Sequence, residues 1–159
     1  MILYKKLTTG TQKQTINNFI KHINSGHPAI VLYYADWCGH CHEFKPIFDK
    51  TAKRILKHFK GDLSIYSIED SLLQKLSRSN QFIENEIPGY PTVLYYSSTN
   101  DIASNKEMYS GERTSSGLLK WIKNKSNLKR LKKNTQKNTQ KNKQKRSRRV
   151  RNRNRTKRM

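Results

Sequence analysis

The sequence predicts an α/β sandwich, in which helices cover both faces of a central sheet. Segments with the 3.6-residue period of an amphipathic helix alternate with strand-like apolar segments between residues 16 and 123. Residues 29–35, Ala-Ile-Val-Leu-Tyr-Tyr-Ala, form a continuous apolar run typical of a central strand that is covered on both faces. A length of 159 residues suits one domain with an ordinary core.

The first half of the pattern consists of a helix, a strand and a longer helix. The first helix ends near Ser25-Gly26, and the strand at 29–35 follows it. A turn with both cysteines then leads into the second helix, whose period continues as far as Gly61. Pro46 lies inside this helix and removes one backbone donor, so we expect a kink rather than an end there. The apolar positions are Ile16, Phe19, Ile20 and Ile23 in the first helix, and Phe44, Ile47, Phe48, Ile55, Leu56 and Phe59 in the second.

The second half adds two helices and three strands. Residues 63–68 form the next strand, and a short helix follows. Residues 92–96 are a strand again, and residues 106–109 return antiparallel to it after a turn. Residues 116–123 close the fold as a helix. The residues behind these assignments are Leu72, Leu73 and Leu76 in the short helix, Thr99, Asn100 and Asp101 in the turn, and Leu118, Leu119 and Ile122 in the last helix.

Positive charge is concentrated at the C-terminal end of the chain. No acidic residue follows Glu112, and 17 of the 33 Lys and Arg residues lie from Lys125 onward. The other 16 basic residues and all 11 acidic ones leave residues 1–124 at about +5. Residues 125–159 also contain a near four-residue repeat with almost nothing apolar. We therefore expect a folded domain at 1–124 and a disordered, Lys/Arg-rich low-complexity tail at 125–159.

The tail is the candidate anion-binding segment. A disordered basic run attracts phosphate backbones without sequence preference, so non-specific nucleic acid is the favoured partner. An acidic protein, a nuclear-import signal and a solubilising end are the alternatives. No aromatic residue follows Trp121, which argues against base stacking on a single strand. The candidate residues are Lys145, Arg146, Arg148, Arg149, Arg151, Arg153 and Arg155.

The chain shows no targeting or membrane segment. Residues 1–10 lack an apolar stretch of signal-peptide length, and no later run approaches the length of a membrane span. We expect an intracellular, soluble monomer without a membrane partner. The abundance of Lys, Asn and Ile hints at an AT-rich genome, which would suit the nucleus or the virion of a large DNA virus.

Trp37-Cys38-Gly39-His40-Cys41 contains both cysteines of the chain, two residues apart, between a strand and a helix. At the first turn of a helix, such a pair lets one sulfur face solvent at the positive end of the helix dipole, with the other in disulfide reach. We expect Cys38 to be the nucleophile, with its thiolate favoured by free N–H groups and by His40, and Cys41 to be the resolving thiol. In a reducing compartment, such a pair is catalytic more often than structural.

Three other interpretations compete with the redox pair. In the first, the cysteines are inert core residues. In the second, they bind zinc together with His40 and His42, although four ligands from one helical turn would make a strained site. In the third, Cys38-Gly39-His40-Cys41-His42 matches the C-x-x-C-H of haem attachment, with Met108 as a candidate axial ligand. The redox pair is favoured because it also accounts for the preceding strand, so no cofactor and no metal are expected.

Four features, in order, resemble the thioredoxin superfamily. They are the Trp-Cys-Gly-His-Cys motif, Pro46 five residues after the second cysteine, Gly89-Tyr90-Pro91-Thr92 before a strand, and Tyr109-Ser110-Gly111-Glu112-Arg113-Thr114 before the last helix. The Gly-His dipeptide and the Gly-Tyr-Pro-Thr segment are most similar to the catalytic domains of protein disulfide isomerases. The resemblance covers residues 10–124 and implies a three-layer thioredoxin-like fold with a mixed sheet, and an oxidoreductase or isomerase that acts on protein thiols and disulfides.

The resemblance also implies a substrate-binding role for Tyr90 and Pro91. Their peptide bond is expected to be cis beside the disulfide, where the backbone of Tyr90 pairs with an extended substrate; without the resemblance, an ordinary trans turn would be expected. Leu32 departs from the family, whose members usually carry a buried acid six residues before the first cysteine. Resolution by Cys41 is therefore expected to be slow or to depend on water, and His42 stands where lysine is common.

Two classes of function remain open. The first is a thiol-disulfide enzyme, with an oxidase or isomerase bias because His40 stabilises the reduced form. The second, favoured by Leu32, is a thioredoxin-like structural or nucleic-acid-binding module with weak exchange activity, tethered by the tail. Trp37 either shapes the apolar rim beside the sulfur or packs in the core. We expect Trp121 to lie in the core. The surface histidines are expected to be His22, His27 and His58.

Overall fold

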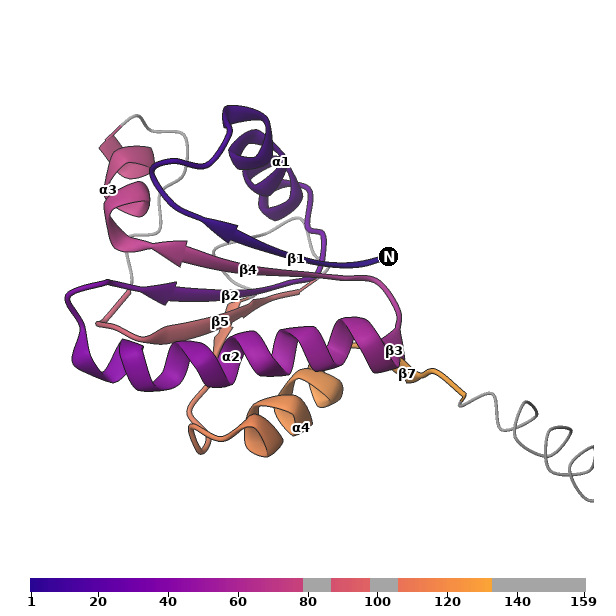
Figure 1. The fold of residues 1–159 in the computed structure, drawn as a ribbon. Helices are drawn as coiled ribbons and strands as arrows, with labels where there is room; N and C mark the ends of the chain where they lie inside the picture. The colour runs from indigo at the N-terminus through magenta and orange to yellow at the C-terminus, as the bar shows by residue number, and fades with distance from the viewer. Residues whose placement is uncertain (79–86, 98–105, 133–159) are drawn as a thin grey trace, which may run out of the picture.

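The computed structural model describes residues 1–78, 87–97 and 106–132, which form a mixed five-stranded sheet between two layers of helices (Figure 1). This is the three-layer architecture that the sequence predicted. The elements in chain order are β1 (Ile2–Leu7), α1 (Lys13–Asn24), β2 (Ala29–Tyr34), α2 (Gly39–His58), β3 (Phe59–Lys60), β4 (Leu63–Glu69), α3 (Asp70–Arg78), β5 (Thr92–Tyr96), β6 (Lys106–Met108), α4 (Ser115–Lys125) and β7 (Lys129–Arg130).

The sheet is built around β2, in the order β1-β4-β2-β5-β6. β1, β4 and β2 run parallel, whereas β5 is antiparallel to β2 and β6 is antiparallel to β5. Every residue of β2 and β4 is buried, which explains the continuous apolar run of β2, whereas β4 also buries Ser64, Ser67 and Glu69. The antiparallel return at residues 106–108 is confirmed.

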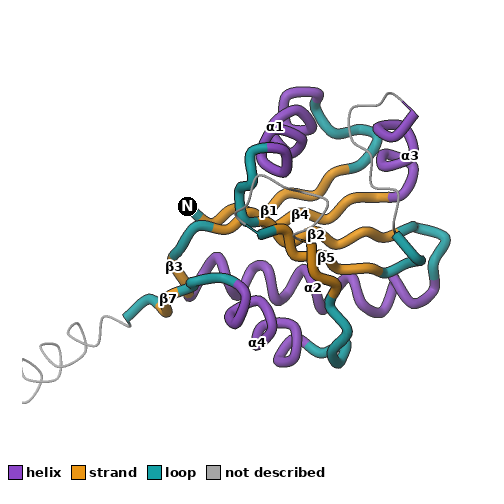
Figure 2. Tube along the Cα trace, turned by 180° about the vertical axis from the view of Figure 1, so that it is seen from behind, coloured by secondary structure: helices purple, strands orange, loops and turns teal. Residues whose placement is uncertain are grey.

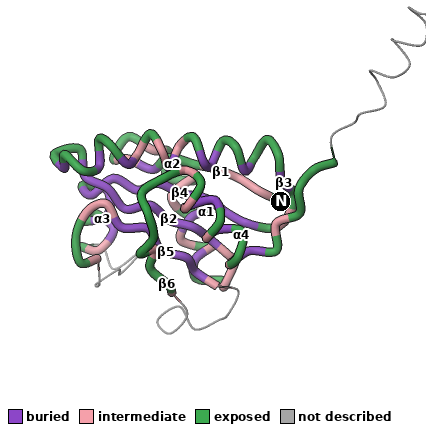
Figure 3. Tube along the Cα trace, turned by 90° about the horizontal axis from the view of Figure 1, so that it is seen from below, coloured by how far each residue is buried: buried purple, intermediate pink, exposed green. Residues whose placement is uncertain are grey.

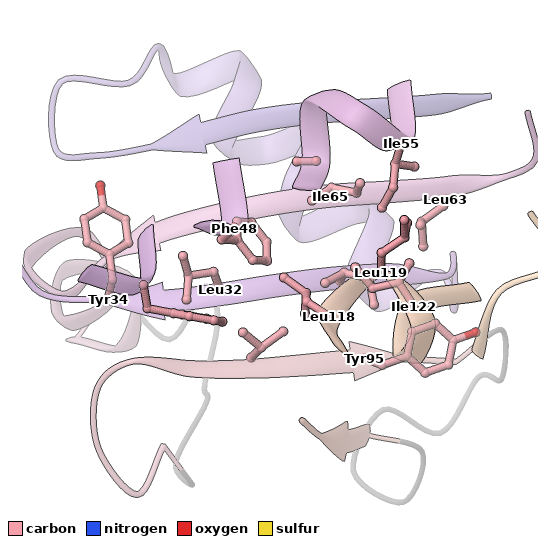
Figure 4. Packing of buried hydrophobic residues seen from close by; sticks show 14 of the residues in the cluster. Leu32, Tyr34, Phe48, Ile55, Leu63, Ile65, Tyr95, Leu118, Leu119 and Ile122 are labelled. Carbon is pink, nitrogen blue, oxygen red and sulfur yellow. The ribbon is translucent and has the colours of Figure 1, made fainter. Parts of the chain in front are cut away.

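Each face of the sheet carries its own core. α1 and α3 cover one face, and α2 and α4 cover the other (Figures 1 and 2). Along α2, exposed and buried positions alternate, as an amphipathic helix requires (Figure 3). The side chains that pack against the sheet are Phe19, Ile23, Leu72 and Leu76 on the first face, and Phe48, Ile55, Leu118 and Ile122 on the second (Figure 4).

β1 is an element that the sequence did not reveal. It pairs with β4 from Ile2 opposite Leu63 to Leu7 opposite Ile68, at one edge of the sheet. Lys5 and Lys6 interrupt its apolar character because an edge strand is solvated on its outer side. A short, mixed hexapeptide of this kind lacks the pattern that identified the central strands.

The folded part of the chain extends eight residues beyond the boundary expected at 124. α4 continues to Lys125, Ser126 is buried, and β7 pairs with β3. The N–H of Leu131 donates to the carbonyl of His58 at 2.8 Å. A Cβ added at Gly61 would lie 2.9 Å from Leu128, so this segment packs closely on the turn before β4. The expectation of disorder from residue 125 is therefore wrong for 125–132, because Leu128 packs on the domain although the segment is largely polar.

Other expectations fall on residues that the structure does not describe. The turn at Thr99, Asn100 and Asp101 and the anion-binding candidates of the tail lie outside the described residues. α2 continues through Pro46 as expected. None of the helices in residues 1–78, 87–97 and 106–132 has the length and apolar character that crossing a bilayer requires.

Three side chains differ from their expected environments. His22 is partly buried, with Nδ1 2.7 Å from the hydroxyl of Tyr66, and burial lowers its pKa. His27 lies 3.6 Å from Asp62, so neither histidine is a plain surface residue, whereas His58 is exposed. Trp121 is only partly buried, and its indole contacts the ring of Tyr109 and donates to Glu107. The partners of the two histidines are 44 and 35 positions away in sequence, beyond any local pattern.

Leu128→Ala should lower the free energy of unfolding by about 1–2 kcal/mol, because Leu128 is partly buried against Gly61 and the second core. The measurement is urea unfolding of the full chain followed by circular dichroism. Leu131→Ala is the matched control: its side chain is 43% exposed, and the expected loss is below about 0.5 kcal/mol. Equal losses in the two variants would show that the segment is not docked through Leu128.

Candidate active site

The cysteines form a disulfide at the N-terminus of α2. The N–H of Cys38 donates to the carbonyl of Ala35 at 3.1 Å, which turns the chain sharply after β2. Cys38 is the N-cap of α2, and its sulfur accepts from the N–H of Cys41 at 3.2 Å. The two Cα atoms are 5.2 Å apart, within the usual range for a disulfide. The strand-to-helix placement predicted from the sequence is confirmed.

The two sulfurs differ in exposure, but less than the sequence suggested. Cys38 is 8% exposed and Cys41 is 2% exposed. Cys38 is therefore the more accessible residue, although most of it is covered. An incoming group therefore meets Cys38 before Cys41.

Tyr90 contacts Cys38, and Trp37 contacts Tyr90. The carbonyl oxygen of Tyr90 lies 3.5 Å from the Cys38 sulfur, and the Tyr90–Pro91 peptide bond is cis. Trp37 is 73% exposed, so its assignment to the core is wrong, and the rim position holds. The rings of Trp37 and Tyr90 meet edge to face with centroids 5.8 Å apart.

The side chain of Tyr90 is hydrogen-bonded to the buried carboxylate of Asp70. The Tyr90 hydroxyl donates to Asp70 at 2.5 Å, and the Gln74 side-chain amide donates to the other oxygen of Asp70 at 2.9 Å. Burial, followed by the hydrogen bond to Asp70, raises the pKa of Tyr90 well above its usual range, so the hydroxyl stays a donor. Sequence reasoning missed Asp70, and the only signal is an acid at the carboxyl end of a predicted parallel strand, where functional groups gather.

Leu32 fills the position at which relatives of this fold usually carry an acid. It is fully buried on β2, in the same core as Cys41, beside Phe48 (Figure 4). Its partner across the ladder on β4 is Ser67, a neutral hydroxyl. Neither residue can accept a proton from Cys41 as a carboxylate would.

The remaining motif residues lie on the first turn of α2. His40 and His42 are exposed, and a Cβ added at Gly39 would meet no other atom within 4 Å. A side chain at position 39 would therefore meet no steric obstacle. Within the part of the chain that the structure describes, no three His, Cys, Asp or Glu side chains are grouped to hold a metal ion.

A disulfide at a helix N-terminus, against a cis-proline segment and a mixed sheet, defines a thioredoxin-fold protein with a Cys-x-x-Cys centre. The comparisons agree: the thioredoxin family model matches residues 10–124. The chain therefore belongs to the thioredoxin family, as the motifs indicated.

The similar proteins are protein disulfide-isomerases. The chain is 32% identical to Protein disulfide-isomerase 1 of Caenorhabditis elegans over 112 residues, which are 70% of this chain and 21% of that protein. It is 30% identical to the Protein disulfide-isomerase A6 homolog of Drosophila melanogaster, over 70% of this chain and 24% of the relative. The chain thus spans less than a quarter of the length of these relatives.

Solved structures show the same fold. The J-Trx1 fragment of ERdj5 superposes with a TM-score of 0.54 and 21% sequence identity, over 76% of this chain and 50% of that one. The zinc-bound form of human ERp44 gives a TM-score of 0.54 and 20% identity, over 77% of this chain and 32% of that one. At this identity, the likeness establishes the arrangement of the elements.

After reduction, iodoacetamide should alkylate Cys38 at least about ten times faster than Cys41 at neutral pH. Cys38 is the more exposed residue, and the free N–H groups of α2 favour its thiolate. The measurement is mass spectrometry of peptides after brief alkylation. Faster labelling of Cys41 would reverse the assignment of the accessible sulfur.

Proposed function

We propose that this protein is a thiol-disulfide oxidoreductase that acts on protein thiols, with Cys38 as the nucleophile and Cys41 as the resolving cysteine. The observation that carries the proposal is the position of the Cys38 sulfur, at the N-cap of α2 and 3.5 Å from the carbonyl of Tyr90. A sulfur there is the more accessible of the pair, lies at the positive end of the helix dipole, which stabilises its thiolate, and has a backbone acceptor next to it.

The reaction proceeds by two exchanges. A substrate thiolate attacks the Cys38 sulfur, a mixed disulfide forms, and the Cys38–Cys41 bond breaks, so that Cys41 leaves as a thiolate and takes up a proton. A second substrate thiolate then attacks the substrate sulfur of the mixed disulfide, which releases Cys38 as a thiolate. The substrate dithiol loses two electrons and becomes a disulfide, and the cysteine pair gains them. The reverse sequence reduces a substrate disulfide.

Tyr90, Pro91 and Trp37 are the substrate-binding residues of the proposal. The carbonyl of Tyr90, beside the Cys38 sulfur, accepts an N–H from an extended peptide whose own sulfur reacts with Cys38. The exposed indole of Trp37 offers an apolar contact for the same peptide. Asp70 is a positioning residue, because it fixes the ring of Tyr90 and hence the direction of that carbonyl.

The proposed activity includes the isomerisation of disulfides in protein substrates. Protonated His40, between the cysteines, stabilises the thiolate and so the reduced form, and a stabilised reduced form makes the oxidised protein a better oxidant. This favours oxidation and isomerisation of substrates over simple reduction. The relatives named as protein disulfide-isomerases support the same direction.

A second candidate rests on Leu32. Because this buried position holds no carboxylate, deprotonation of Cys41 has no internal acceptor at the family's usual place. The second function is therefore a thioredoxin-like binding module with weak exchange activity, held at an anionic partner by the basic residues that follow residue 132, including Arg148 and Arg151. Residues 1–132 are its folded domain in this proposal.

Cys41→Ser should accumulate mixed disulfides with protein substrates, because substrate captured by Cys38 is no longer released by the resolving thiol. The measurement is non-reducing electrophoresis after the reduced variant is incubated with scrambled, disulfide-bonded ribonuclease, whose disulfides the Cys38 thiolate attacks. Cys38→Ser is the matched control and should trap little. Trapping by Cys38→Ser but not by Cys41→Ser would exchange the two roles, and trapping by neither would favour the module.

The reduction potential should lie above about −230 mV, well above the −270 mV typical of thioredoxin. His40→Ala should lower it by about 30 mV, because the imidazolium no longer stabilises the Cys38 thiolate. His42→Ala removes the neighbouring exposed histidine, which faces another side of the helix, and should leave the potential unchanged. Equilibration with glutathione gives all three values. A wild-type potential near −270 mV would contradict the isomerase direction.

A further inference from the structure

The end of the domain opposite the disulfide carries a concentrated positive surface. Its members are exposed lysines and arginines of three elements, which the chain brings together where α2 ends (Figure 1). We call this surface the basic end, and it consists of Lys53, Arg54 and Lys57 of α2, Lys60 of β3, and Lys129 and Arg130 of β7.

The pairing of β3 with β7 sets like charges against each other. Lys60 lies directly opposite Lys129 in the antiparallel ladder. Like charges in this arrangement repel across the strands. On α2, Lys53 and Lys57 are four residues apart and Arg54 and Lys57 are three apart, which again places like charges side by side. The fold thus concentrates positive charge here at a cost in stability.

No carboxylate among the described residues forms an ion pair with the basic end. The acid nearest in sequence, Asp62, lies 2.9 Å from the amino group of Met1 and 3.6 Å from His27. Asp49 of α2 is held by Lys6 and by the hydroxyl of Tyr4. The negative end of the α2 dipole accounts for a cation in the last turn of the helix, but not for the opposed lysines of the two short strands.

The described chain ends at Lys132, two residues beyond β7, so the basic end is also where the most basic part of the sequence begins. Residues 133–159 add 13 lysines and arginines and no acid. The positive charge of the folded surface therefore continues in the sequence that follows it.

From this arrangement we propose that the basic end is a docking surface for the phosphate backbone of a nucleic-acid duplex. Regularly spaced phosphates neutralise several lysines and arginines at once and release counterions, which gives affinity without sequence preference. Within the described residues, Trp37 is the one large aromatic side chain that is exposed, and it lies at the other end of α2. The basic end therefore lacks a platform for stacking bases and fits a duplex backbone rather than a single strand.

The redox site stays accessible when this surface is occupied. α2 has 20 residues, and at about 1.5 Å per residue its two ends are roughly 30 Å apart. A duplex bound at the C-terminal end of α2 does not cover Cys38, which lies at the other end of the helix. The protein can therefore carry out thiol exchange on substrates next to the nucleic acid that holds it.

The test removes three charges from the basic end of the full chain. Lys57→Gln/Lys60→Gln/Lys129→Gln should weaken binding to a short, labelled, mixed-sequence DNA duplex by about tenfold or more near 0.15 M salt. The slope of log K against log salt should fall by about 0.9 for each lost phosphate contact. Fluorescence anisotropy across a salt series measures both quantities. Thiol exchange should be unchanged, and the variant should unfold at the wild-type temperature or slightly above it, because the repulsion between Lys60 and Lys129 is removed.

Lys5→Gln/Lys13→Gln/Lys21→Gln is the matched control, because it removes the same charge from exposed positions on β1 and α1. Its binding should stay within about twofold of the wild type. Equal weakening of binding in the two triple variants would show that binding depends on net charge alone. Wild-type affinity in the variant at Lys57, Lys60 and Lys129 would show that the sequence after residue 132 is the whole binding segment. Equal competition by poly-glutamate would indicate an acidic protein instead. Each of these three results overturns the proposal.

Discussion

The antiparallel register of β2 and β5 is the constraint on which the site depends. Tyr33 lies opposite Thr92, so the end of β2 and the start of β5 meet at one edge of the sheet. The turn after β2 leads to Cys38, and the residues before β5 are Tyr90 and Pro91, which is how the sulfur comes to face a carbonyl. A slip of one residue would turn each side chain of β5 to the other face and separate these groups.

A third strand completes the arrangement. β4 runs parallel to β2 with Glu69 opposite Tyr34, so Asp70 begins α3 at the same edge as the disulfide. From there it accepts the hydroxyl of Tyr90. The disulfide, the carbonyl beside it and the carboxylate that accepts the Tyr90 hydroxyl therefore lie at the ends of three adjacent strands, β2, β5 and β4.

Local patterns in the sequence predicted the central elements, and what they missed depends on contacts between distant residues. The apolar run at 29–35, the cysteine spacing and the helical periods are properties of short windows, and they located β2, α2 and the cysteine pair. β1 was missed because an edge strand tolerates Lys5 and Lys6, and the docking of 125–132 was missed because it depends on Leu128 meeting Gly61. The contact of Asp70 with Tyr90 likewise arises from strand order, which no short window contains.

The length of α2 separates the two electrostatic environments of the molecule. At physiological ionic strength, charges are screened over about 8 Å, whereas the ends of α2 are roughly 30 Å apart. The lysines and arginines at the end of α2 therefore contribute almost nothing to the stability of a thiolate at Cys38. That thiolate is governed by groups close to it, which are the N–H of Cys41, 3.2 Å from the sulfur, and the other N–H groups in the first turn of α2. Evolution can thus change the charge that localises the protein without retuning its redox chemistry, and the reverse also holds.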